Sequence, residues 1–201
     1  MLYHYSDIEK NVRVAINANC HQQPLIDDPA QLRLSEIIRH CTERAAARAV
    51  LDAELHRLER GHTFGDSLRW QPGEKWGYVP LPPDFLRLVA FQMSDWRMPV
   101  TQAISPDCDE YLLQHIPYAG LRGNPQMPVC AVVNRQEGLA LEFYSCQSDS
   151  ATVVQAFYAP QPRIAADDTI DISEPLYAAT VDICASMTKK IISNISNTVE
   201  R

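Results

Sequence analysis

Glycine is scarce in this chain of 201 residues, with 7 glycines against 14 prolines. Glycine-rich loops that bind phosphate are therefore nearly excluded, whereas rigid turns and strand ends are favoured. No stretch approaches the ~20 apolar residues of a membrane helix, so we expect no membrane span. Residues 1–7, MLYHYSD, also lack the basic and apolar regions of a signal peptide. We therefore expect folding in a reducing cytoplasm.

Basic side chains are outnumbered, because 18 Lys and Arg face 25 Asp and Glu, which gives a formal net charge of −7 at pH 7. The field of such a chain opposes binding to nucleic acid and to anionic membranes. A hydrophobic content of 46% excludes wholesale disorder, and the length allows one large domain or two small ones. The composition thus predicts a soluble, acidic protein of mixed α and β structure.

Residues 1–64 show helical periodicity. A first helix is predicted around Ile8 and Val12, and a second starts at Asp28-Pro29, a cap residue followed by proline at the first helical position. The second helix is expected to end at Gly61, because glycine commonly follows the last helical turn. Its charged outer face is either a solvated surface or a subunit contact. The arginines of that face include Arg39, Arg44 and Arg48.

Residues 65–75 are rich in turn-forming residues and are predicted to be a linker. Residues 76–165 are then divided by prolines into short runs, several with the period-2 alternation of strands. Because no helix is expected between these runs, they predict an antiparallel β-sandwich or barrel-like domain. The expected strands are 78–81, 86–93, 100–104, 111–116, 129–134, 139–144 and 152–158.

The acidic, proline-containing residues 160–174 are expected to form a connector, and Ser173 to cap a closing helix within 173–201. The last part, residues 189–199, is polar and β-branched, so we expect it to fray or to extend as a tail. The predicted fold class is α+β. Helical parts 1–64 and 173–201 pack together, and the β domain lies between them in the sequence.

Thiol and imidazole groups occur in two adjacent pairs, Cys20-His21 and His40-Cys41, which together could supply four zinc ligands. Neighbouring residues of a helix point about 100° apart, and no close ligand spacing is present, so we expect no metal. No cysteine lies in a recognisable nucleophile turn. All six cysteines are expected to be reduced, and they are Cys20, Cys41, Cys108, Cys130, Cys146 and Cys184.

Carboxylates cluster at residues 27–28, 107–110 and 167–171, where capping or a solvated turn explains them. The tryptophans and phenylalanines of residues 64–96 are expected to be core residues. The chain is therefore expected to have no catalytic residue, to hold no cofactor and to be no enzyme.

The most distinctive segment is residues 78–88, YVPLPPDFLRL, in which prolines fix an extended backbone, Asp84 ends it and Phe85 begins a strand. This segment resembles one in head–tail connector proteins of tailed bacteriophages, of the tail tubular protein A type, also called the adaptor or gatekeeper ring. Those proteins have the same order of N-terminal helices, a turn-rich stretch, a β domain and a closing helix, here residues 175–195. The organisation also resembles proteins of phages that infect gut Bacteroidetes.

The resemblance implies a structural virion protein located at the head–tail junction. Twelve copies would form a homo-oligomeric ring between the portal and the tail or a neighbouring ring, and DNA would pass the lumen without sequence-specific binding. An acidic channel wall repels the DNA backbone and so suits this role. Contacts around such a ring join two different faces of each subunit.

Partner contacts are expected on the arginine-bearing helix face and at the C-terminus. There, four apolar residues at spacings of three to four form a stripe that the core need not cover, and Lys189 and Lys190 could direct it to an acidic portal surface. The stripe comprises Ile191, Ile192, Ile195 and Val199. Two other functions remain open: a small-ligand or carbohydrate-binding β-sandwich module, and a hydrolase with a cysteine or carboxylate site.

Overall fold

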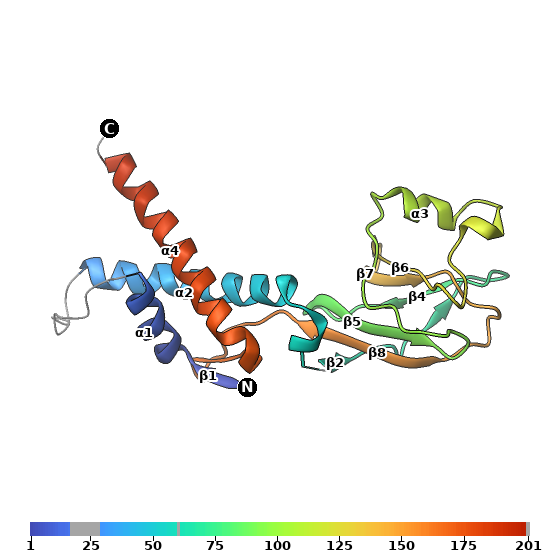
Figure 1. The fold of residues 1–201 in the computed structure, drawn as a ribbon, viewed down its shortest axis with the longest axis horizontal. Coiled ribbons are helices and arrows are strands. Elements are labelled where there is room, and N and C mark those ends of the chain that lie inside the picture. The colour runs from blue at the N-terminus through green and yellow to red at the C-terminus, as the bar shows by residue number, and fades with distance from the viewer. Residues whose placement is uncertain (17–28, 60, 200–201) are drawn as a thin grey trace. The chain divides into compact units, whose positions relative to one another are not determined.

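The computed structural model describes residues 1–16, 29–59 and 61–199, and the side chains of these except 29–33, 119 and 195–199. The chain divides into two compact units. Unit 1 comprises residues 1–59 and 161–201, and unit 2 comprises residues 60–160. Helices at both ends flank antiparallel sheets along the chain, so the predicted α+β class is confirmed (Figure 1).

Unit 1 is built on α1 (Tyr5–Ala15), α2 (Pro29–Asp52) and α4 (Tyr177–Val199). Their apolar faces share one core, which includes Ile8 of α1, Ile38 of α2 and Cys184 of α4, all 0% exposed. A short antiparallel pair, β1 (Leu2–His4) with β9 (Thr169–Asp171), closes the unit. The prediction that the N-terminal and C-terminal helices pack together is therefore confirmed.

The predicted end of the second helix was wrong. α2 ends at Asp52 and not at Gly61, and a 3₁₀ turn, η1 (Leu55–Arg57), follows. Glu54 and Leu58 on either side of η1 have extended backbone, which stops the α-helical pattern. The Ser173 hydroxyl donates to the Arg57 carbonyl at 3.1 Å and fixes this end of the segment. A second 3₁₀ turn, η3 (Glu174–Leu176), leads into α4.

Unit 2 contains two antiparallel sheets. One has the order β2 (His62–Thr63), β8 (Val153–Pro160), β5 (Phe85–Met93), and the other β3 (Arg69–Trp70), β4 (Gly77–Pro80), β7 (Gly138–Phe143), β6 (Cys130–Arg135). They face each other across a common core, in which the rings of Phe91 and Phe143 lie 5.9 Å apart. The sheets thus form the predicted sandwich.

Three predictions between residues 65 and 116 were wrong. The expected linker 65–75 contains β3, which pairs with β4. The expected strand 111–116 is helical, because α3 spans Asp109–Gln114, and Asp109 and Glu110 in its first turn favour a helix start. Residues 100–104 contribute only isolated bridges through Val100 and Ile104. A run of six residues is too short for its sequence pattern to distinguish a strand from a short helix.

The strand expected after the proline-rich segment begins at Phe85. The hydroxyl of Tyr158, in the neighbouring β8, donates a hydrogen bond to Asp84 Oδ1 at 2.9 Å. The Tyr158 ring stacks on the Phe85 ring, with 5.8 Å between the ring centres. Phe85 N–H donates to the Pro82 carbonyl at 3.0 Å and closes the turn before the strand. The segment that carries the family resemblance therefore fixes where β5 starts beside β8.

Phe85 is half-buried and not fully buried. Phe85→Ala should therefore cost about 2 kcal/mol of unfolding free energy, below the ~3–5 kcal/mol of a fully buried phenylalanine. Phe91→Ala, at a position with 0% exposure on the same strand, is the matched control and should show that larger loss. Urea unfolding of both variants measures the difference, and equal losses would contradict the partial burial of Phe85.

Candidate functional site

The α2–α4 contact is made of small side chains. Cys41 and Ala45 of α2 and Cys184 and Ala185 of α4 are at most 5% exposed. The Thr42 hydroxyl donates to the Ile38 carbonyl at 2.8 Å, so this buried polar group is satisfied within its own helix. Small residues allow close approach of the two helices.

The three arginines predicted to bind a partner differ in what they contact. Arg39 pairs with Asp168 at 2.7 Å, and its guanidinium lies 5.0 Å from the centre of the Tyr5 ring. The hydrogen bond to Asp168 raises the pKa of Arg39. Arg48 pairs with Asp52 one turn away at 2.6 Å. Arg44 is exposed and makes no ion pair with any residue that the structure describes, so its charge is the most available to a partner.

The expected C-terminal tail is helical, since α4 continues to Val199, and the prediction of a frayed end was wrong. Lys189 and Lys190 are exposed, and Ile192 is 38% exposed. Ile191, however, packs against the core of unit 1, so it does not belong to a free stripe. The side chains of Ile195 and Val199 lie outside the described residues.

Sequence reasoning missed the most concentrated set of polar contacts in unit 2, on the outer face of the four-stranded sheet. Glu142 of β7 is 4% exposed, and its Oε1 accepts two hydrogen bonds from Arg135 of β6, the one from Nε at 2.9 Å. Its Oε2 accepts the hydroxyls of Tyr144 and, at 3.2 Å, of Tyr111 in α3. A charged residue within an otherwise apolar run, 138–144, was the available signal.

Aromatic rings enclose this carboxylate. The guanidinium of Arg135 lies 3.9 Å from the centre of the Tyr78 ring. The ring centres of Trp76 and Tyr144 are 5.9 Å apart. His115, at the end of α3, contacts Tyr144 at 5.4 Å between ring centres. Burial raises the pKa of Tyr144 and of Tyr111, so both phenols stay protonated and donate. Because both carboxylate oxygens accept hydrogen bonds, one of them from Tyr111 of α3, the group anchors α3 to the sheet.

The predicted acidic turn at residues 167–171 makes both local and long-range contacts. Asp167 accepts the Thr169 hydroxyl at 2.7 Å, and this hydrogen bond lowers the pKa of Asp167. Asp168 adopts a left-handed backbone (φ 59°) and pairs with Arg39. The Asp168 carbonyl accepts the Tyr5 N–H at 2.8 Å. Asp168 thus fastens the chain before β9 to α1 through its backbone carbonyl and to α2 through its carboxylate.

Only one of the two thiol–imidazole pairs, His40 with Cys41, lies within the described residues. His40 is exposed whereas its neighbour Cys41 is 1% exposed, and Cys20 and His21 lie outside the described residues. Across the part of the chain that the structure describes, no three His, Cys, Asp or Glu side chains are placed to hold a metal ion.

The five described cysteines are free thiols, and only Cys108 is partly exposed. Burial raises the pKa of Cys146 to about 12 and that of Cys130 well above its usual range. We therefore expect an alkylating reagent to modify Cys108 of the native protein quickly and the buried cysteines slowly. After unfolding without reductant, mass spectrometry should find six modified cysteines, and a protected pair in freshly prepared protein would contradict reduced thiols.

Comparisons of this chain with protein families, with curated proteins and with solved structures find no match. None of the described helices has the length and apolar character needed to cross a membrane.

Proposed function

We propose that this protein is a structural virion component, a head–tail connector of the adaptor-ring type between the portal and the tail of a tailed phage. The observation that supports this most is the packing of α4 with α1 and α2 in one core, although unit 2 separates them in the sequence. Together with the 78–88 segment before β5, this is the arrangement that the family resemblance implies.

In this proposal the ring contains twelve copies joined by head-to-tail contacts, and the helical unit binds the portal or the adjacent copy. Exposed cations are available for such contacts at Arg44, Lys189 and Lys190. A chain of net charge −7 repels the phosphate backbone, so DNA would move through the lumen without adhering to it. The protein would fold in the host cytoplasm before it joins the virion.

The proposal is tested by co-expression with the portal protein encoded in the same genome. A tag on the portal should recover both proteins, and electron microscopy should show an added ring of this chain, twelve copies in number, on the portal. Arg44→Glu combined with Lys189→Glu should weaken recovery, because it reverses two exposed charges. Lys75→Glu, which reverses an exposed charge in unit 2, is the matched control and should leave recovery unchanged. A portal that binds none of this protein would refute the assignment.

A further inference from the structure

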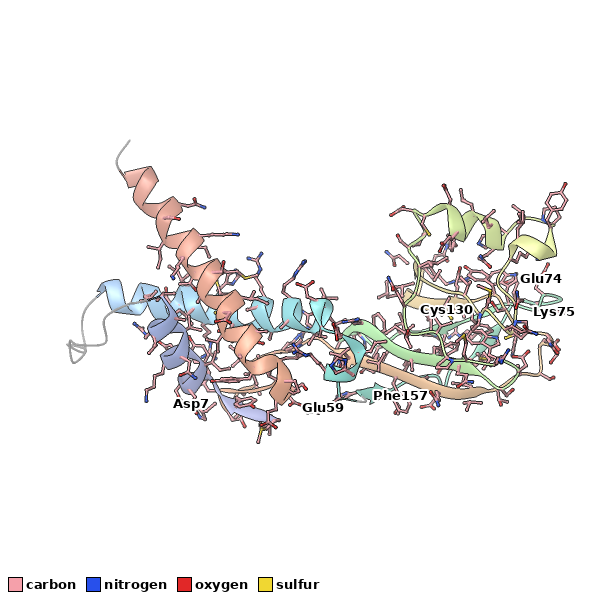
Figure 2. The ribbon with its side chains drawn as sticks, viewed as in Figure 1. Asp7, Glu59, Glu74, Lys75, Cys130 and Phe157 are labelled. Atoms are coloured by element: carbon pink, nitrogen blue, oxygen red, sulfur yellow. The ribbon has the colours of Figure 1, made fainter. Side chains whose placement is uncertain are left out.

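The three-stranded sheet of unit 2 is incomplete beside β8. Both residues of β2 pair with β8, and the second of them, Thr63, lies opposite Phe157. Phe64 N–H then donates one more hydrogen bond, to the Ala156 carbonyl at 3.1 Å. Figure 1 shows β2 beside β8, and Figure 2 labels Phe157 on β8. Within the part of the chain that the structure describes, no strand continues β2 along residues 153–155.

The chain leaves β8 directly after Phe64. Gly65 has a φ of 113°, which glycine adopts readily, and the chain then turns to β3 in the other sheet. On the β5 side, a register shift between Gln155 and Val153 leaves Val154 without a cross-strand partner in β2 or β5. Val154 is also 59% exposed. On the β2 side, this stretch of β8 is therefore open to a further strand.

A hollow of about 420 Å³ adjoins this open edge. It is lined by the turn after β2, including Phe64 and Leu68, and by residues 152–157. Phe64, Leu68 and Val153 are partly buried and pack against the core of the sandwich, so one side of the hollow is apolar. Because a strand advances by ~3.3 Å per residue, the open edge offers about 10 Å, enough for three or four residues of an extended chain.

The other edges of the two sheets are protected against strand pairing. β6 is bridged by Ile104, β5 pairs with Val100 and carries Arg87, and β2 and β3 are only two residues long. Short strands, charged side chains and covering segments are the usual protection of sheet edges. Residues 150–162, in contrast, contain no charged side chain, and their prolines come after the open part of β8. The open edge thus carries Thr and Val, which favour strand pairing, and lacks the charges and prolines that prevent it.

Asp66 is the one charged residue that lines the hollow, and it forms no ion pair with any described residue. We propose that the hollow binds an extended segment of a partner protein, which joins the sheet as a strand beside residues 153–155 and places a Lys or Arg against Asp66. The open backbone selects an extended chain, the apolar side accepts its alternate side chains, and Asp66 favours a basic segment over an acidic one. The site lies in unit 2 and does not depend on the proposed ring.

NMR titration of the ¹⁵N-labelled full chain tests the site with a peptide of sequence KTVTVTK, blocked at both ends. The amide signals of residues 153–156 should move, with a Kd of about 1 mM or lower. The peptide KTVPVTK should not bind, because its central proline has no N–H and interrupts the strand. Val154→Pro removes an N–H from the open edge and should abolish binding, whereas Val154→Thr keeps that N–H and should bind as the wild type does. Circular dichroism checks that each variant is folded.

Charge exchange tests the same site without a change in the backbone. At low salt, the peptide ETVTVTE should bind the wild type about tenfold more weakly than KTVTVTK, and Asp66→Lys should reverse that order. Glu74→Lys is the matched control, because Glu74 is exposed but does not line the hollow, and it should leave the order unchanged.

The remaining outcomes each overturn the proposal. They are amide signals that do not move at several millimolar KTVTVTK, equal binding of KTVPVTK, a folded Val154→Pro chain that binds like the wild type, and an Asp66→Lys chain that still prefers the basic peptide. Self-association of the wild type through residues 153–155, seen by sedimentation and lost in Val154→Pro, would make a second copy the occupant. The portal experiment does not involve this peptide, so the connector proposal and the strand-binding proposal can fail separately.

Discussion

Arg135→Met is expected to lower the free energy of unfolding by about 3–5 kcal/mol, the usual cost of removing one partner from a buried ion pair. The side chain of Glu142 is only 6% exposed, and Arg135 supplies both hydrogen bonds to one of its oxygens. Without Arg135, a carboxylate would remain among Tyr78, Tyr144 and Trp76 with too few donors. Urea unfolding measures the loss.

Adding Glu142→Leu to Arg135→Met should recover most of this stability, because the double variant leaves no unpaired charge. The recovery will be incomplete, since the Tyr111 and Tyr144 hydroxyls lose their acceptor. Arg69→Met is the matched control: its partner Glu137 is 58% exposed, so the loss should stay within about 1 kcal/mol. Equal losses of unfolding free energy in Arg135→Met and Arg69→Met would contradict a larger contribution from the buried Arg135–Glu142 pair.

The sequence predicts best what depends on neighbouring residues. The prolines before Asp84 predicted the start of β5, and the alternation in residues 139–144 predicted β7. The same alternation places Ala140, Glu142 and Tyr144 together on one face of this strand, and all three are buried. They are covered by a separate stretch of chain, residues 105–128, which contains α3. Local alternation contains no information about such a covering segment.

The sequence predicts poorly what depends on distant partners. The charges of Arg39 and Arg48 look alike along the chain, but Arg39 is held by Asp168, 129 residues away, whereas Arg48 is held by Asp52 within its own helix. The stripe predicted at the C-terminus was likewise incomplete, since Ile191 packs on the core of unit 1. Helical spacing identifies a face, but only the fold decides which part of it remains free.

A chain shortened by residues 192–201 is expected to fold normally but to fail to join the portal. The last core positions of α4 are Thr188, at 0% exposure, and Ile191, and both remain in the shortened chain. Ile192 is the first removed residue, and it is partly exposed. The melting temperature should therefore stay within about 2 °C of the wild type, because little apolar area is lost.

The expected loss of assembly follows from the proposed connector role. Ile192, Ile195 and Val199 share a helical face by their spacing, and Lys189 and Lys190 precede them on exposed positions. Charges steer association whereas apolar groups hold the complex, so Lys189→Ser with Lys190→Ser should slow portal binding, and the truncation should abolish it. A chain ended after Met187 is the matched control, since the loss of Thr188 and Ile191 should lower the melting temperature. A 192–201 truncation that still binds the portal would show that the end of α4 is dispensable, and one that does not fold would show that it belongs to the core.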